Sequence, residues 1–239
     1  LFLSGGLGGM RGAQPLAATM AGAVFLGIDV DPTRIKRRLE TRYLDEQAKY
    51  LEQALKLVEE YKAKGVAKSI GLEGNCADIL PELVKRGYVP EVVTDQTSAH
   101  DELVGYVPNG MTLAEALELR AKDPKTYITK SRAAMAQHVE AMVALKDKGA
   151  IVFDYGNNIR AQAVEGGFDR AFEFQGFVPE FIRDQFCLGR GPFRWSVLSG
   201  EAQDIYTIDD ALLAAFPEDT TLQKWIPEAK KKVAFQGLP

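Results

Sequence analysis

Five glycines near the start of the chain offer the clearest chemistry in the sequence. They are Gly5, Gly6, Gly8, Gly9 and Gly12, between a short apolar run and an Ala-rich segment that opens near Pro15. A turn without β-carbons lets a phosphate approach the backbone, and the N–H groups of a following helix favour an anion. The spacing Gly6-x-Gly8-x-x-x-Gly12 is one residue longer than the usual dinucleotide fingerprint. The pattern favours a phosphate-binding turn over its alternative, a flexible N-terminal loop.

The second apolar run ends in two carboxylates, Asp29 and Asp31. Asp29 lies at the distance where Rossmann-like folds place an acid against the adenosine ribose hydroxyls. Asp31 directly precedes Pro32 and suits the N-cap of the next helix, a role that is also the alternative for Asp29. In the basic stretch 32–38, Arg34 is close enough to reach a ribose or phosphate. The rest of that stretch is interpreted as a solvated helical face.

Later apolar runs also end in polar groups. Residues 68–78, 90–101 and 150–160 each read as a strand followed by Gly, Asn, Asp or Gln. In a doubly wound sheet, ligands bind beyond the carboxyl ends of the strands, so these groups are expected to converge. His100 is as consistent with a loop histidine satisfied by its neighbouring carboxylate as with a ligand. His138 lies in a long helical pattern and is interpreted as structural.

The elements that position these groups alternate between strand and helix. Apolar spacing predicts helices over 46–64, ended by Gly65, and through the segment that ends at Gly87. This alternation predicts an α/β fold, a Rossmann-like, mostly parallel sheet with helices on both faces. The pattern stops near Gly176, and two helices are expected around 208–216 and 221–233. We place a domain boundary near 178, with 1–178 as the dinucleotide-binding domain and 179–239 as a connecting segment.

Composition narrows the class of protein. A net charge of −4 over 239 residues gives no electrostatic case for nucleic acid or an anionic membrane. No apolar stretch is long enough to span a bilayer, so a cytoplasmic setting is the expectation. Cys76 and Cys187 lie far apart without paired spacing, which supports neither a disulfide framework nor a metal site. The chain lacks an initiator Met and opens inside an expected strand, so we expect a piece of a longer protein.

Several stretches, in order along the whole chain, together resemble one family, urocanase or urocanate hydratase. The matching stretches are GGLGGM at 5–10, GAQPLA at 12–17, DVDP at 29–32, GN at 74–75, DQTSAHD at 95–101, DYGNNIR at 154–160, GPFRW at 191–195 and FQGLP at 235–239. The combination is far more specific than any glycine motif.

The resemblance implies a tightly held NAD⁺ that acts as an electrophile and carries no hydride. The nicotinamide ring adds to the imidazole of urocanate, water is added, and the product is imidazolone propionate, a step of histidine degradation. The resemblance also implies a homodimer at full length. Two other hypotheses stay open: a second enzyme, an NAD-dependent dehydrogenase domain, and a protein of a different class, a non-catalytic dinucleotide-binding module.

The resemblance carries over a set of cofactor contacts. On the phosphate-facing turn it implies Gly8, Gly9, Met10, Arg11 and Gly12, and on the adenosine side Asp29 and Arg34. The later strand ends contribute Asn75, Cys76, Gln96, Thr97, Ser98, Ala99, His100, Tyr106, Val107 and Tyr155. Arg194 resembles the arginine that receives the substrate carboxylate. No residue of this segment is assigned a catalytic role.

The sequence departs from the family pattern at three of these positions. Arg11 stands where Ser or Gly is usual, Asp29 where Glu is usual, and Cys76 where Ala is usual. The family is also more than twice this length, and its reactive cysteine belongs to a segment beyond Pro239. Cys187 is not that residue and is interpreted as a small buried apolar side chain. We therefore expect this chain to bind NAD⁺ and not to hydrate urocanate alone.

Overall fold

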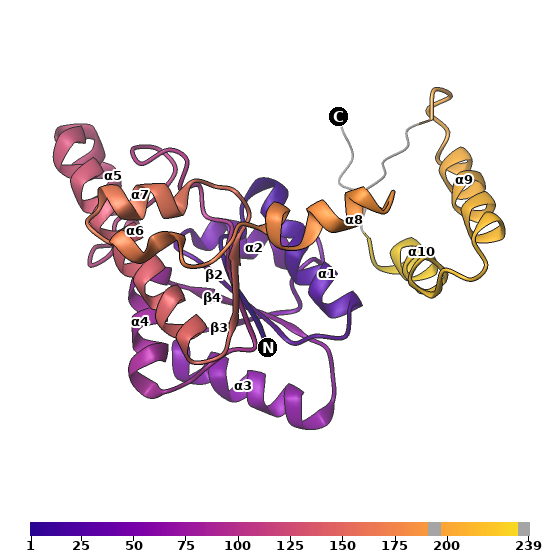
Figure 1. Ribbon diagram of the computed structural model, residues 1–239, viewed down its shortest axis with the longest axis horizontal. Coiled ribbons are helices and arrows are strands. Elements are labelled where there is room, and N and C mark those ends of the chain that lie inside the picture. The colour runs from indigo at the N-terminus through magenta and orange to yellow at the C-terminus, as the bar shows by residue number, and fades with distance from the viewer. Residues whose placement is uncertain (191–196, 234–239) are drawn as a thin grey trace. The chain divides into compact units, whose positions relative to one another are not determined.

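The computed structural model describes residues 1–190 and 197–233, and a parallel sheet forms the core of its first 181 residues (Figure 1). Its strands are β1 (Phe2–Gly5), β2 (Phe25–Asp29), β3 (Glu46–Ala48), β4 (Ser69–Glu73), β5 (Val92–Asp95) and β6 (Ile151–Asp154). Their order in the sheet is β3-β4-β2-β1-β5-β6, and every neighbouring pair is parallel. The chain moves outward from β1 and then returns to place β5 on its other side. The topological switch point therefore lies between β1 and β5.

Helices cover both faces of this sheet. The described helices are α1 (Gln14–Met20), α2 (Pro32–Glu40), α3 (Leu51–Lys64), α4 (Cys76–Arg86), α5 (Leu113–Lys122), α6 (Pro124–Asp147), α7 (Ile159–Glu165), α8 (Arg183–Cys187), α9 (Ala202–Ala215) and α10 (Thr220–Lys232). Short helical turns add η1 (Gly9–Ala13), η2 (Asp169–Phe172) and η3 (Val178–Ile182). One apolar cluster joins the sheet to α3, α4, α6 and α7, and a smaller cluster joins it to α1 and α2. The predicted Rossmann-like α/β fold is confirmed.

Local sequence signals explain where several helices begin and end. The Asp31 side chain accepts a hydrogen bond from the Thr33 N–H at 2.9 Å, as an N-cap does, and Pro32 occupies the first turn. Gly65 and Gly87 end α3 and α4 with φ of +63° and +69°, where a side chain would be strained. The predicted cap and both predicted helix ends are therefore confirmed.

The helix expected over 46–64 was wrong at its start. Residues Glu46–Ala48 form the edge strand β3 against β4, and the helix begins only at Leu51. Asp45 pins this strand by accepting hydrogen bonds from the Ser69 N–H and hydroxyl, both at 2.8 Å. Pairing with a distant strand overrides a helical periodicity that the local residues share. Near the other end of the chain, α9 begins at Ala202, earlier than the expected 208.

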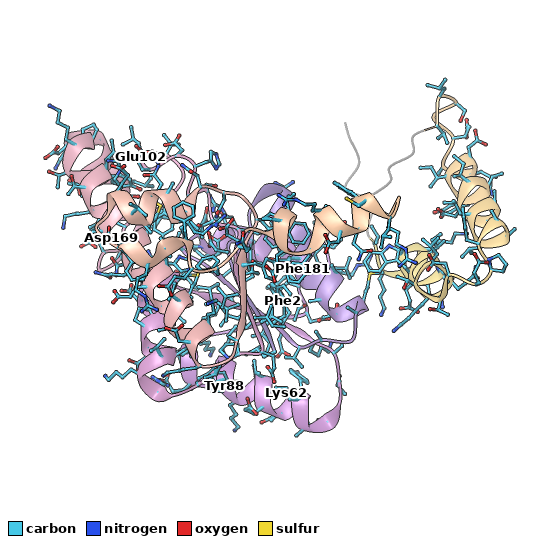
Figure 2. All side chains as sticks on the ribbon, viewed as in Figure 1. Phe2, Lys62, Tyr88, Glu102, Asp169 and Phe181 are labelled. Carbon is cyan, nitrogen blue, oxygen red and sulfur yellow. The ribbon has the colours of Figure 1, made fainter. Side chains whose placement is uncertain are left out.

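The chain divides into two compact units, Leu1–Phe181 and Ile182–Pro239. The predicted boundary near 178 lies at the start of η3, which contains Phe181 (Figure 2). Phe181 and the preceding Phe177 pack on Phe153 of β6 with ring centroids 5.0 and 5.9 Å away. These aromatic contacts hold the chain up to Phe181 against the sheet, and the first unit ends at that residue. None of the helices described in either unit is long and apolar enough to cross a membrane.

Candidate functional site

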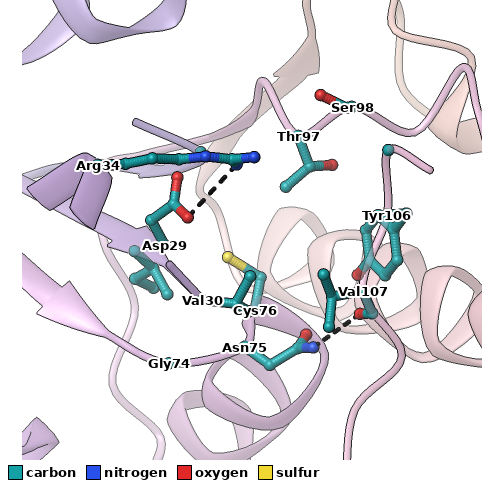
Figure 3. A pocket seen from close by; sticks show the side chains of 13 residues that line it. Asp29, Val30, Arg34, Gly74, Asn75, Cys76, Thr97, Ser98, Tyr106 and Val107 are labelled. Atoms are coloured by element: carbon teal, nitrogen blue, oxygen red, sulfur yellow. Dashed lines mark hydrogen bonds and ion pairs between the residues drawn. The ribbon is translucent and has the colours of Figure 1, made fainter. Parts of the chain in front are cut away.

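A pocket opens beyond the carboxyl ends of β1, β2, β4 and β5 (Figure 3). Its lining is Gly6, Ile28, Asp29, Val30, Arg34, Gly74, Asn75, Cys76, Thr97, Ser98, Gly105, Tyr106 and Val107. The position matches the ligand crevice of doubly wound sheets.

Asp29, the last residue of β2, is the buried acid of this pocket, with only 4% of its surface exposed. Its carboxylate accepts hydrogen bonds from the backbone N–H of Leu7 at 2.7 Å and of Asp31 at 2.9 Å. Burial raises the pKa of this carboxyl above its ordinary value, while the Arg34 charge and the two N–H donors oppose that rise. Each oxygen holds one backbone donor and keeps lone pairs for further donors.

Arg34 lies beside Asp29 at the mouth of the pocket, and 42% of its side chain is exposed. Its guanidinium is 3.5 Å from Asp29 and 3.4 Å from Asp31, and Figure 3 shows it beside Asp29. A β-carbon on Gly8 would be 3.6 Å from this side chain. Arg34 therefore joins the acidic strand end to the Gly-rich turn and presents a partly solvated cation at the pocket.

Gly5 and Gly6 permit the close approach of the chain after β1 to the chain after β5. Gly6 has φ of +90°, and a β-carbon there would lie 2.9 Å from the carbonyl oxygen of Gln96. A β-carbon on Gly5 would lie 2.6 Å from the Asp95 carboxylate and 2.9 Å from the Cys76 sulfur. A side chain at Gly6 would need the backbone to move, and one at Gly5 would displace the buried side chains of Asp95 and Cys76, which explains the glycine pair at the switch point.

The opposite wall is a loop held by Asn75. The Asn75 side chain accepts a hydrogen bond from the Ala77 N–H at 2.9 Å, which caps α4, and donates one to the Val107 carbonyl at 2.9 Å (Figure 3). The Tyr106 ring lines the pocket, but its hydroxyl lies 3.1 Å from His138 Nδ1 in the interior. Asn75 therefore positions the wall through its side chain, and Tyr106 offers the pocket its ring and backbone.

A buried polar network lies under the switch point around Asp95. Its carboxylate accepts hydrogen bonds from the Thr97 N–H and hydroxyl, at 3.1 and 2.8 Å, and from the Asn157 amide. His138 Nε2 lies 4.0 Å away, and burial lowers the pKa of this histidine below its ordinary value although the Asp95 charge opposes the shift. The interpretation of His138 as a structural residue agrees with its complete burial. This network fixes the loop that follows β5.

Cys76 lines the pocket as the first residue of α4. Burial raises the pKa of its thiol well above the usual range, and the charges of Asp95 and Asp29 add to the rise. Such a thiol stays protonated and is a poor nucleophile. Cys187, in contrast, is exposed, so its interpretation as a buried apolar residue was wrong: the short α8 buries none of its residues.

The structure gathers about half of the predicted site residues around the pocket. Asp29, Arg34, Asn75, Cys76, Thr97, Ser98, Tyr106 and Val107 line it. Gly8, Gly9, Gly12, Gln96, Ala99, His100 and Tyr155 lie outside this lining. Ala99 is fully buried in the core, His100 is exposed, and Tyr155 packs on Phe177 with centroids 4.6 Å apart. Arg194 and the side chains of Met10 and Arg11 lie outside what the structure describes.

Sequence reasoning missed Arg38, which was interpreted as part of a solvated helical face. Only 3% of Arg38 is exposed, and its guanidinium donates to the carbonyls of Leu7 at 2.9 Å and Gly9 at 3.0 Å. A β-carbon on Gly12 would lie 1.8 Å from its Nε. The one available signal was its position one turn after Arg34 in α2, on the face that returns toward the glycines. The close approach of Gly12 to Arg38 can be recognised only in the tertiary structure.

Polar groups are also buried on the sheet face toward α1. Within the described residues, the Ser4 and Thr94 hydroxyls and the Gln96 Oε1 have no hydrogen-bond partner. Ser4 and Thr94 are directly paired on β1 and β5, and Gln96 is the first residue after β5. Buried polar atoms without partners are rare in folded proteins and point to a bound polar group or water at the switch point.

Sheet order, switch point and pocket together define a Rossmann-like α/β domain with a ligand crevice at its carboxyl edge. A family model described as the urocanase Rossmann-like domain matches residues 1–181. A second, described as the urocanase C-terminal domain, matches residues 184–239. The chain belongs to the urocanase family.

Proposed function

We propose that this chain forms the NAD⁺-binding part of a urocanate hydratase. The observation that carries the proposal is the buried Asp29 at the end of β2, beside Arg34 and the Gly-rich turn, in a pocket at the switch point. In Rossmann-like sheets this acid accepts hydrogen bonds from the adenosine ribose, and the turn before α1 receives the pyrophosphate. The assignment as a hydratase rests on family membership, and the assignment of a dinucleotide ligand rests on the pocket.

The residues present fit the adenosine ribose and the pyrophosphate of the proposed cofactor. Both Asp29 oxygens retain acceptor sites for the ribose hydroxyls, while a 2′-phosphate would meet a carboxylate, which favours NAD⁺ over NADP⁺. The cation of Arg34 and the open space at Gly9 suit the pyrophosphate.

When bound, NAD⁺ would supply the electrophilic ring that the family reaction requires. The residues of this chain would bind and orient the cofactor: Asp29 holds the ribose, the loop fixed by Asp95 closes one side, and the Tyr106 ring excludes water. Among the described lining residues, burial keeps the Cys76 thiol and the Tyr106 hydroxyl protonated. Neither suits the transfer of protons to an imidazole near neutral pH. We therefore propose that this pocket supplies the cofactor side and that hydration of urocanate needs additional groups.

Mass spectrometry of the ligand released from purified, denatured chain tests the proposal, together with calorimetric titration of ligand-free protein. We expect NAD⁺ as the ligand and saturable binding that is weaker for NADP⁺. Reduction of the bound nicotinamide by an added substrate, seen as absorbance in the reduced-nicotinamide band, would favour a dehydrogenase over the proposed hydratase. Loss of urocanate absorbance at an enzyme-like rate would show that the chain holds the complete catalytic set.

A further inference from the structure

Arg38 is a buried cation whose described polar contacts are both to main-chain carbonyls. It projects from α2, and its Nε and Nη2 hold the carbonyl oxygens of Leu7 and Gly9. A buried charge is costly unless hydrogen bonds or an opposite charge compensate it. Its nearly complete burial, at 3% exposure, therefore indicates a role in holding the turn.

The two hydrogen bonds fix the orientation of two peptide groups in the Gly-rich turn. In a planar trans peptide, the C=O and the following N–H point in opposite directions. Since the Leu7 and Gly9 carbonyls point at Arg38, the N–H groups of Gly8 and Met10 point away from it. A β-carbon on Gly9, between these N–H groups, would meet no atom within 4 Å, and one on Gly8 would lie 3.6 Å from the partly exposed cation of Arg34.

The turn is also held from two other directions. The Leu7 N–H donates to Asp29 at 2.7 Å, and the Gly6 N–H donates to the Ile28 carbonyl at 2.8 Å. Gly12 completes the arrangement because any side chain there would occupy the place of the Arg38 guanidinium. The turn is therefore preorganised from its protein side, with its N–H donors free to face a ligand.

We propose that Arg38 is the positioning residue of the phosphate site: its guanidinium fork holds the Leu7 and Gly9 carbonyls and thereby presents the Gly8 and Met10 N–H groups to a diphosphate. The proposal deepens the proposed function, on which the identity of the diphosphate as NAD⁺ rests. The fork matters as much as the charge. Two parallel N–H donors in one plane match two carbonyls, and a lysine ammonium on a flexible stem does not.

The test uses the 239-residue chain with inorganic pyrophosphate as the probe and amide NMR as the readout. In the parent, pyrophosphate should shift the amide signals of Gly8 and Met10. Arg38→Lys preserves the charge and should lose most of these shifts, whereas the matched variant Arg37→Lys, at an exposed position on the same helix, should keep them. Gly12→Ala, which displaces the guanidinium and leaves its charge, is the second variant and should behave like Arg38→Lys.

Titration with NAD⁺ and adenosine separates positioning from general damage to the fold. Arg38→Lys should weaken the binding of NAD⁺ roughly tenfold or more, the effect of losing one charge-assisted hydrogen bond. The same variant should change the affinity for adenosine by less than about twofold. Unshifted Gly8 and Met10 signals in the parent, or parent-like shifts in Arg38→Lys, would overturn the inference. A parent that responds to pyrophosphate but does not bind NAD⁺ would refute the proposed function and leave the role of Arg38 supported.

Discussion

The two compact units differ in how much of their sequence they bury. The first, Leu1–Phe181, packs apolar side chains on both faces of its sheet, whereas the second buries only Asp209 and Ile226 among its described residues. In α9 and α10 the large side chains of Ile205, Tyr206 and Trp225 are exposed. Helical periodicity is enough to predict a helix, but burial is what stabilises one. The first unit thus buries an apolar core that can stabilise its fold and its pocket, whereas the described part of the second unit buries almost none.

The largest effect is expected when the two units are produced separately. Residues 1–181 alone should unfold cooperatively and bind NAD⁺ within about threefold of the 239-residue chain, a change of less than about 1 kcal/mol. Residues 182–239 alone should lose most of their helical circular dichroism, since short helices without a packed face are marginal in water. A cooperative thermal transition in the isolated second unit, or loss of the fold in the first, would reverse the comparison.

Within the first unit, substitutions at two glycines of the turn should differ sharply in their effect on the free energy of unfolding. Gly6→Val places a β-branched side chain at φ of +90°, against the Gln96 backbone, and should cost about 3 kcal/mol or more in the free energy of unfolding. Gly9→Ala meets no atom within 4 Å and should change it by less than about 1 kcal/mol. Urea denaturation of both variants measures the difference. Equal destabilisation would show that the close approach at Gly6 does not matter.

His138 should give the first unit a pH dependence that the second lacks. Burial lowers its pKa in the folded state from the ordinary 6.5, so the unfolded chain binds the proton more readily. Stability is therefore fully present above pH 6.5 and falls as the pH drops below it, by at most about 1.4 kcal/mol per pH unit. His138→Gln should remove this part of the slope in urea titrations between pH 7.5 and 5.5. The truncated chain 1–181 should keep it, and an unchanged slope in His138→Gln would assign it to other groups.

The smallest effect is expected at the exposed thiol of the second unit. Cys187→Ala should change the free energy of unfolding by less than about 0.5 kcal/mol and leave NAD⁺ binding unchanged. Native iodoacetamide labelling, followed by mass spectrometry, should modify Cys187 and leave the buried Cys76 unmodified, because its thiol is desolvated and protonated. Faster labelling of Cys76 would contradict its burial in the pocket wall.

The fold could be predicted because its signals are local. Alternating apolar runs, the cap at Asp31 and the glycines at 65 and 87 each act within a few residues of their position. The edge strand Glu46–Ala48 was missed because its only partner, β4, lies more than twenty residues away in the sequence. Periodicity identifies faces, but strand pairing at an edge is a tertiary property.

The candidate site was predictable only where residue type decides the role. Asp29 was singled out by its distance from the glycines and Tyr106 by the family resemblance, and both line the pocket. The direction of the Tyr106 hydroxyl, toward His138, could not be inferred because that histidine lies on α6, thirty-two residues later. Arg38 was missed for the same reason: a basic cluster looks alike in sequence whether a side chain is solvated or buried under a turn.

Calorimetric titration of the ligand-free 239-residue chain with NAD⁺ tests the central claim most directly, with Asp29→Ala and Asp31→Ala as a matched pair. Asp29 lines the pocket, whereas Asp31 caps α2 at its rim. We predict saturable binding that Asp29→Ala weakens by about tenfold or more, equivalent to about 1.4 kcal/mol, and that Asp31→Ala weakens by less than about threefold. A folded chain that does not bind NAD⁺, or that binds it equally well without the Asp29 carboxylate, would contradict the account.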